Sequence, residues 1–401
     1  MLLMMLTFFG YSNNKEMRET KYMLWIIILF ILLLIIDFQL GRFLVSKRNK
    51  SQNWRTTAEE VELFADGNSL FEAMLSDIEK ATESIDIQFF IIRNDRISNQ
   101  FYTLLAHKHE EGVRVRLLAD WMGSFKFREK WLDQKVFMRK MNPPRIPFFY
   151  HLQQRNHRKV LVIDQKISYF GGFNLGNEYV GKDVLLGKWR DYHFRMVGEI
   201  GEVLQQSFAI DWGETNKGQI SQTGDVKVLA TEGDVLEKEL LHYMENTKES
   251  IEIGSPYFIP TRKLEQALID ALARGVDVTI MVPDKSDHII AKAAALPYLR
   301  KMKEHGATIY LYVDGFFHAK VLFFDRKTCD AGTANFDRRS LQLNQELNLI
   351  VSHEHPIYHE IRKAFEADIK TSKKITDTWL NHQPLYIRTL SWISFPFRIF
   401  L

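Results

Sequence analysis

The segment HRKVLVIDQKISYFGGFN at residues 157–174 has a counterpart, HAKVLFFDRKTCDAGTAN, at residues 318–335. Both copies space a histidine, a lysine, an aspartate, a glycine and an asparagine identically: His157, Lys159, Asp164, Gly171 and Asn174, then His318, Lys320, Asp325, Gly332 and Asn335. The apolar runs VLVI and VLFF suit buried strands, and residues two apart on a strand point to the same face. We therefore expect each histidine to project beside its lysine. If the copies pack about a pseudo-twofold axis, the four side chains can meet in one cleft suited to a phosphate group.

The similarity between the two copies extends upstream into a longer internal repeat. ESIDI at 83–87 recurs as ESIEI at 249–253, and GVRV at 112–115 recurs as GVDV at 275–278. Amphipathic segments at 70–82, 99–111, 235–248 and 264–274 predict helices that alternate with these apolar strands. Helices alternating with apolar strands are typical of α/β folds. The sequence therefore predicts two similar α/β domains that pack against each other.

Composition sets limits on domain number and on the kind of site. The 401 residues are 46% apolar and 26% charged, as in an ordinary globular protein of two or three domains. We expect domains at 57–216 and 217–375, with a polar junction near 214–224, after an N-terminal segment at 1–56 and before a tail at 376–401. The single cysteine, Cys329, excludes a disulfide framework and a cysteine-rich zinc site. No HExxH or EF-hand pattern occurs either, so we expect no metal and no cofactor.

An uncharged apolar run, YMLWIIILFILLLII at 22–36, predicts a membrane anchor extending over about 22–44. A buried core helix is disfavoured because the run is apolar all round, and a cleaved signal peptide because no small-x-small site follows. Three basic residues precede the run, Lys15, Arg18 and Lys21, and five follow it before residue 57: Arg42, Lys47, Arg48, Lys50 and Arg55. No acid occurs between 41 and 57 on that following side. By the positive-inside rule, we expect the remaining chain to be cytoplasmic. A second apolar stretch, Met1 to Phe9, is too short to span the membrane alone.

The doubled pattern resembles the HKD motif of the phospholipase D superfamily. The flanking sequences WRDYHFRMVG at 189–198 and NFDRRSLQLNQELNL at 335–349 are most similar to those of bacterial cardiolipin synthases. The resemblance covers about residues 57–375. It implies two phospholipase D-like domains, each a mostly β-sheet core flanked by helices, related by a pseudo-twofold axis and preceded by a transmembrane helix.

The resemblance also implies a metal-free, two-step phosphoryl exchange. By analogy with the family, His157 is the nucleophile and His318 the general acid and base, although the sequence itself is nearly symmetric here. Lys159, Lys320, Asn174 and Asn335 are expected to donate to the phosphate oxygens. Each histidine should need a carboxylate on its other ring nitrogen, and Glu178 and Glu346 match the family's positions for one. Asp164 and Asp325 end their strands, so we expect them to anchor loops.

The implied function is a membrane-bound cardiolipin synthase that uses phosphatidylglycerol in an anionic membrane. The alternative is a hydrolase acting on phospholipid or nucleic acid with the same motifs. A net charge of +3 gives no sign of a long basic groove, so we expect no nucleic-acid partner. Two segments are candidates for contact with lipid: the basic, aromatic stretch at 126–150 and the aromatic tail at 384–401. A solvated basic helix and a terminal helix packed on the domain are the respective alternatives.

Overall fold

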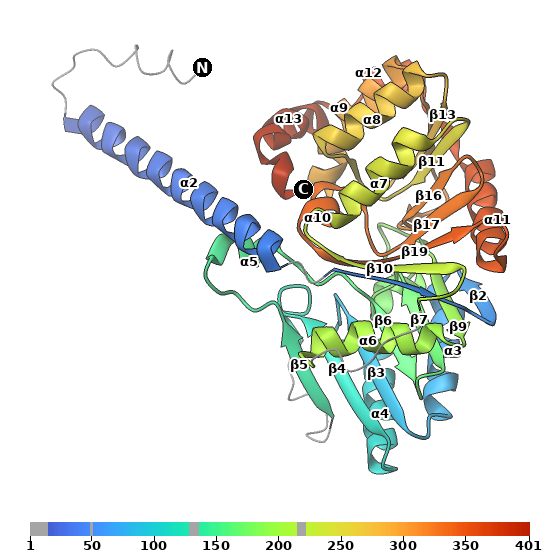
Figure 1. Cartoon of the computed structure of the whole chain (residues 1–401). Coiled ribbons are helices and arrows are strands. Elements are labelled where there is room, and N and C mark those ends of the chain that lie inside the picture. Colours follow the sequence, from blue (N-terminus) through green and yellow to red (C-terminus); the bar gives the residue numbers. More distant parts are fainter. Residues whose placement is uncertain (1–14, 49–50, 128–135, 215–221) are drawn as a thin grey trace.

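The computed structural model describes residues 15–48, 51–127, 136–214 and 222–401. Figure 1 shows two sheets with helices around and between them, and one long helix that stands away from the rest. The predicted α/β fold with two similar halves is confirmed.

The two halves share one strand order. The first sheet runs β2 (Glu60–Phe64), β9 (His193–Val197), β7 (Ile167–Gly171), β6 (Val160–Ile163), β3 (Ser84–Phe89), β4 (Arg114–Asp120) and β5 (Phe137–Met141). The second runs β1 (Gln52–Thr56), β10 (Val226–Glu232), β19 (Gln345–Ser352), β17 (Thr328–Gly332), β16 (Val321–Phe324), β11 (Ser250–Gly254), β13 (Asp277–Pro283), β14 (Thr308–Tyr312) and β20 (Lys373–Lys374). Removing β1 and β20 leaves a sheet that matches the first strand for strand. The repeat seen in the sequence is therefore a repeat of topology.

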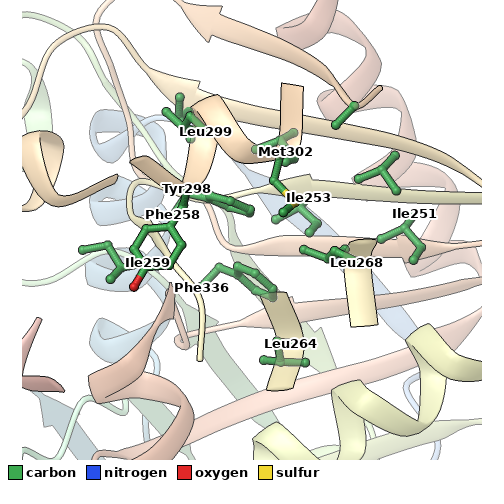
Figure 2. Close-up of a cluster of buried hydrophobic side chains, with 14 of the residues drawn as sticks. Ile251, Ile253, Phe258, Ile259, Leu264, Leu268, Tyr298, Leu299, Met302 and Phe336 are labelled. Carbon is green, nitrogen blue, oxygen red and sulfur yellow. The ribbon is translucent and has the colours of Figure 1, made fainter. Parts of the chain in front are cut away.

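Amphipathic helices cover the sheets. Helices α3 (Gly67–Glu79) and α4 (Arg96–Glu110) pack on the first sheet, and α7 (Val235–Asn246), α8 (Arg262–Ala273) and α9 (Ile289–Glu304) pack on the second. Asp66, Asp95 and Thr261 cap the N-termini of α3, α4 and α8 through their side chains, which explains where these helices begin. Figure 2 shows the core of the second half, where Leu268 of α8 lies beside Ile251 and Ile253 of β11, and Leu264 of α8 lies on the side of Phe336.

A third core layer joins the two sheets. It contains α6 (Ile200–Trp212) and α11 (Pro356–Thr371), together with apolar side chains from both sheets, such as Val162, Phe194, Val228 and Leu349. The boundary between the two halves, called the seam below, is also crossed by a short strand pair: β8 (Trp189–Arg190) of the first half runs parallel to β15 (Phe316–Phe317) of the second. The two halves therefore share one continuous apolar interior, in which burial supplies the main driving force for their association.

The predicted border at residue 56 does not separate the anchor segment from the second half. Strand β1 pairs with β10 of the second sheet, whereas β2 pairs with β9 of the first. The chain passes from one sheet to the other between residues 56 and 60. Most of the predicted junction at 214–224, residues 215–221, lies outside the described part of the chain.

The anchor segment forms one helix, α2 (Lys15–Arg48), and its stretch Glu19–Lys47 is long and apolar enough to cross a membrane. Its apolar side chains are largely exposed, which fits a lipid-facing helix and not a buried core helix. It meets the remaining chain at α5 (Phe148–Gln153), where the Asp37 carboxylate accepts the main-chain N–H groups of Phe148 at 2.7 Å and Tyr150 at 2.9 Å. The Met1 to Phe9 stretch lies outside the described residues.

The two candidate lipid-contact segments have different structures. In the basic segment Phe137 is exposed, as is Phe125 just before it, but Phe127 is buried. Residues 137–141 form strand β5 and not the solvated helix that was the alternative. Residues 128–135 lie outside the described chain. The tail forms α13 (Leu385–Ser394) and the 3₁₀ helix η3 (Phe395–Phe400). Ile387 of α13 packs on Ala293 and Leu296 of α9. The opposite side of the tail exposes six large apolar side chains: Leu385, Tyr386, Trp392, Ile393, Phe395 and Phe397.

Candidate active site

The two HKD motifs begin just before a strand. His157 and Lys159 precede β6, and His318 and Lys320 precede β16, so these four residues are not themselves in strands as the spacing predicted. Main-chain hydrogen bonds to the opposite half hold them in place: the N–H of His157 donates to Gln345 O at 2.8 Å, and that of His318 donates to Arg190 O at 2.7 Å. Each motif is therefore fixed by the other half of the molecule.

Both histidines line one cavity of about 580 Å³ between the two halves, and Asn174 and Asn335 line it with them. Aromatic rings hold each imidazole edge-on or tilted, with Phe90 5.0 Å from His157 and Trp189 4.9 Å from His318 between ring centroids. The repeat therefore brings both histidines to one cleft as expected, whereas Lys159 and Lys320 are not among the described residues that line it.

Glu346 is the carboxylate beside His157. Its Oε2 lies 2.9 Å from Nδ1 of the imidazole. The same carboxylate accepts the hydroxyl of Thr333 at 2.6 Å and the side-chain amide of Asn344 at 3.2 Å. A carboxylate held by further donors fixes the imidazole with its proton on Nδ1 and leaves Nε2 free as a nucleophile or base.

Asp191 has the same relation to His318. Its Oδ2 lies 2.5 Å from Nδ1 of His318, while Oδ1 accepts the main-chain N–H of Tyr192 at 2.8 Å. Burial favours the neutral form of this carboxyl, but Lys320 and His318 outweigh burial and lower the pKa of Asp191. Each histidine therefore takes its carboxylate from the opposite half.

The assignment of Glu178 as a histidine partner is wrong. Its carboxylate pairs with Arg93, at 2.9 Å between Oε1 and Nη2. Glu346 is a histidine partner, but of His157 and not of the histidine in its own repeat. Sequence spacing within one repeat could not reveal a partner that comes from the other half.

A signal for Asp191 does exist in the sequence. The glycines of the two motifs pair with His193 and Asn348, and Asp191 and Glu346 each stand two residues before these positions. Aligning RDYHF at 190–194 with QELNL at 345–349 therefore makes Asp191 the counterpart of Glu346.

The lysines lie beside the histidines and are nearly inaccessible to solvent. Lys159 Nζ donates to the main-chain oxygen of His157 at 2.6 Å, whereas Lys320 Nζ lies 2.6 Å from His318 Nδ1 and 3.4 Å from Asp191 Oδ2. Burial lowers the pKa of Lys159 to about 7 and also lowers the pKa of Lys320. An anion placed in the cavity would raise both values and hold the lysines in their charged form.

Burial also acts on both histidines. It lowers the pKa of His157, with Glu346 opposing the shift, and together with the Lys320 charge it lowers the pKa of His318 to about 4. Both imidazoles are therefore neutral near pH 7 in the free protein. A neutral imidazole is the form required of a nucleophile.

The remaining motif residues divide into two groups. Asn174 accepts the main-chain N–H of Ile91 at 3.0 Å, and Oδ1 of Asn335 has no partner among the described residues. Asp164 accepts the N–H groups of residues 82, 83 and 84, and Asp325 accepts those of residues 248, 249 and 250. The expectation that these aspartates anchor loops is confirmed, because each fastens the turn after its strand to the start of a neighbouring strand.

Comparison with known proteins gives a consistent result. A family model described as "Cardiolipin synthase, PLD-like domain" matches residues 74–184 and 240–369. The chain is 38% identical to the minor cardiolipin synthase ClsB of Bacillus subtilis over 94% of this chain and 98% of that protein. It is 34% identical to a cardiolipin synthase of Oceanobacillus iheyensis, over 83% of this chain and 74% of that protein.

A solved structure supports the fold. The phosphatidylserine synthase of Haemophilus influenzae superimposes with a TM-score of 0.70 at 13% identity, covering 87% of this chain and 97% of that one. At such low identity this likeness concerns the fold alone. With the family match in both halves and the similarity to ClsB over nearly the whole chain, the protein belongs to the family of cardiolipin synthases with phospholipase D-like domains.

Proposed function

We propose that the protein is a membrane-bound phosphatidyltransferase that joins two phosphatidylglycerol molecules into cardiolipin and releases glycerol. One observation supports this most: two histidines, each held by a carboxylate of the opposite half, face one cavity in a chain similar to cardiolipin synthases over nearly its whole length. Two imidazoles around one phosphate can serve as nucleophile and proton donor in turn.

In the first step, Nε2 of His157 attacks the phosphorus of the donor lipid. A bond forms between this nitrogen and phosphorus, the bond from phosphorus to the headgroup oxygen breaks, and His318 gives its Nε2 proton to the departing glycerol. The free protein holds the pKa of His318 at about 4, so this proton must come with the substrate. The anionic phosphodiester raises the pKa of His318 and stabilises its doubly protonated ring.

In the second step, the terminal hydroxyl of another phosphatidylglycerol gives its proton to His318 and attacks the phosphohistidine. The phosphorus–nitrogen bond breaks, cardiolipin forms and His157 returns to its starting state. Lys159 and Lys320 supply positive charge beside the reacting phosphate, and Asn174 and Asn335 supply amide donors to its oxygens. Each step is a group transfer without a change of oxidation state, so no redox cofactor takes part.

The chain associates with the membrane through α2, and we infer that the catalytic halves lie on the cytoplasmic side. The inference rests on the basic residues Arg42, Lys47 and Arg48 at the end of α2 that leads into the sheets. Addition of protease to spheroplasts, and separately to inverted vesicles, tests it. Cleavage in the catalytic halves is expected only in inverted vesicles, and cleavage in intact spheroplasts would contradict the orientation.

Product analysis tests the reaction itself. The purified full-length protein is incubated with phosphatidylglycerol as the only lipid, and the lipids are separated by thin-layer chromatography. We expect cardiolipin and free glycerol in equal amounts, with little phosphatidic acid. Phosphatidic acid as the main product would identify the protein as a hydrolase and contradict the proposal.

A further inference from the structure

Three arginines line the cavity, and their charges are balanced in different ways. Arg93 pairs with Glu178 at 2.9 Å, and Arg155 pairs with Asp120 at 3.0 Å. Arg339, in α10 (Arg338–Gln342), has no carboxylate oxygen within 4.0 Å in the described part of the chain. Among the residues described, Arg339 is therefore the one arginine of the cavity lining that has no ion-pair partner.

The hydrogen bonding of Arg339 is also incomplete. Nη2 donates to the main-chain oxygen of Gln153 at 2.9 Å, while Nε is shielded from solvent and has no partner in the described structure. A cation withdrawn from water is costly unless an opposite charge and hydrogen-bond acceptors compensate for the loss of hydration. A cavity-lining guanidinium in this state is suited to bind an anion that enters the cavity.

Arg339 is connected to the first histidine through Asn344. The main-chain N–H of Asn344 donates to Arg339 O at 2.8 Å, and its side-chain amide donates to Glu346, the carboxylate beside His157. The Arg339 guanidinium itself bonds to Gln153, which lies four residues before His157 in the chain, so an anion held by Arg339 would lie on the same side of the cavity as His157.

That side of the cavity is also the side nearest the membrane helix. Phe400 and Leu401 line the cavity, and the ring of Phe400 lies 5.1 Å from Phe38 of α2 and 5.2 Å from Phe149 of α5, between centroids. Gln153, the acceptor for Arg339, is the last residue of α5, the helix that docks on α2. In Figure 1, α10 and the C-terminus lie toward the side on which α2 meets α5. A contact between aromatic rings thus joins the anchor to the part of the cavity that Phe400 lines.

We propose that Arg339 binds the phosphate of the acceptor phospholipid, with the acceptor's chains leaving the cavity past Phe400 toward the bilayer. The proposal rests on the proposed function, because cardiolipin contains two phosphates separated by one glycerol. While the donor phosphate is bonded to His157, the acceptor phosphate must lie one glycerol away in the same cavity. A guanidinium matches a phosphate through two parallel hydrogen bonds, which a lysine cannot reproduce.

The first experiment separates donor cleavage from transfer in the full-length protein with detergent-dispersed phosphatidylglycerol. Arg339→Gln should lower cardiolipin formation about 10- to 100-fold, the effect of losing a charge-assisted hydrogen-bonded pair, and raise the share of phosphatidic acid. The initial burst of glycerol release, which reports phosphohistidine formation, should change less than about threefold. An equal loss in the burst and in cardiolipin would overturn the proposal, because Arg339 would then serve the donor or the fold.

The neighbouring Arg338 provides a matched control. Its guanidinium donates to Pro260 O and to the hydroxyl of Tyr298, and it does not line the cavity. Arg338→Gln should leave the ratio of cardiolipin to phosphatidic acid unchanged. Arg339→Lys should restore part of the transfer lost in Arg339→Gln, because lysine keeps the positive charge but cannot make the two parallel hydrogen bonds of a guanidinium. A ratio that falls equally in Arg338→Gln would contradict a specific role for Arg339.

The second experiment uses soluble acceptors, so its outcome does not depend on cardiolipin being the natural product. Isotopically labelled glycerol and glycerol 3-phosphate compete for the phosphatidyl group of unlabelled phosphatidylglycerol, and the two labelled lipid products, phosphatidylglycerol and phosphatidylglycerophosphate, are compared. The protein should prefer glycerol 3-phosphate by about tenfold or more, and Arg339→Gln should remove the preference. A protein that makes no cardiolipin but keeps this preference would refute the proposed function and retain the anion site. The same preference in Arg339→Gln would refute the anion site.

Inorganic phosphate distinguishes a lipid headgroup from a free ion. It should weaken transfer by competing with the acceptor, without reducing the burst, and only in the protein that carries Arg339. Inhibition by phosphate combined with no preference between the two glycerol acceptors would mean that the site takes free phosphate, which would overturn the assignment to the acceptor lipid.

Discussion

The two histidine sites share one motif but differ in their electrostatic surroundings. Around His157, the carboxylate of Glu346 is held by Thr333 and Asn344, and Lys159 bonds only to a main-chain oxygen. Around His318, Lys320 donates to the main-chain oxygen of His318 in the same way, but its Nζ also lies beside Nδ1 of the imidazole and beside the Asp191 carboxylate. The lysine charge is thus closer to His318 and contributes to lowering its pKa to about 4. A symmetric sequence pattern can therefore place two identical side chains in unequal chemical roles.

Replacing either histidine should have the largest effect on activity. His157→Ala and His318→Ala should each lower turnover by at least about a thousandfold, because each removes a group that bonds to or exchanges protons with the reacting atoms. The two variants should differ in trapping: with labelled phosphatidylglycerol and a rapid acid quench, His318→Ala should still carry label on His157. Label found on His318 in the His157→Ala variant would reverse the roles.

Replacing the carboxylates tests the crossed pairing. Glu346→Gln and Asp191→Asn should each lower kcat by about 100- to 10,000-fold, because the imidazole loses the partner that fixes its tautomer. Glu178→Gln is the matched control, since Glu178 contacts Arg93 and neither histidine. Its kcat should fall by less than about tenfold. A loss with Glu178→Gln as large as that with Asp191→Asn would restore the assignment made from sequence spacing.

The two lysines should differ in their effect on the thermal stability of the protein. Lys159 has a pKa near 7 in the folded protein and 10.5 when unfolded, so the unfolded chain binds more protons between these pH values. The buried charge therefore destabilises the fold fully below pH 7, and the penalty disappears as the pH rises toward 10.5. Lys159→Met should raise the Tm by about 5 °C at pH 7 and by less at pH 10, while activity is lost.

Lys320→Met is the counterpart in this experiment. Lys320 compensates the buried Asp191 carboxylate, so its removal should give no gain in Tm at pH 7. Differential scanning calorimetry of both variants measures the contrast. Equal gains for the two lysines would mean that the two sites are electrostatically equivalent.

The smallest effect concerns the joint between the anchor and the catalytic halves. Gly41 lies against Tyr150 of α5, and a Cβ at this position would stand 2.1 Å from Cγ of that ring. Gly41→Val should push α5 away from α2 and lower activity about tenfold on phosphatidylglycerol bilayers, with a smaller loss on detergent-dispersed lipid. Leu40→Val, on the exposed side of the helix, should leave both activities unchanged. Equal losses on bilayers and in detergent would contradict a role in orienting the cavity at the membrane.

The sequence predicted those features that depend on local pattern. The strands at VLVI and VLFF, the repeat, the meeting of the two histidines and the loop-anchoring roles of Asp164 and Asp325 follow from apolar runs and fixed spacing. Features that depend on contacts across the seam could not be predicted in this way. The pairing of Asp191 with His318 and of β1 with the second sheet joins residues more than a hundred positions apart. Aligning the repeats makes Asp191 the counterpart of Glu346, but it does not say which histidine each carboxylate meets.

The crossed carboxylates have a consequence for how such a molecule can change over evolutionary time. In a symmetric dimer of a single half, every substitution would appear at both sites at once, so a change that improves a nucleophile would also alter the proton donor. Once both halves belong to one chain, each histidine always meets the same carboxylate, and the two sites can be selected separately. The exchange of Glu346 and Asp191 across the seam keeps the halves dependent on each other while their sequences are free to diverge.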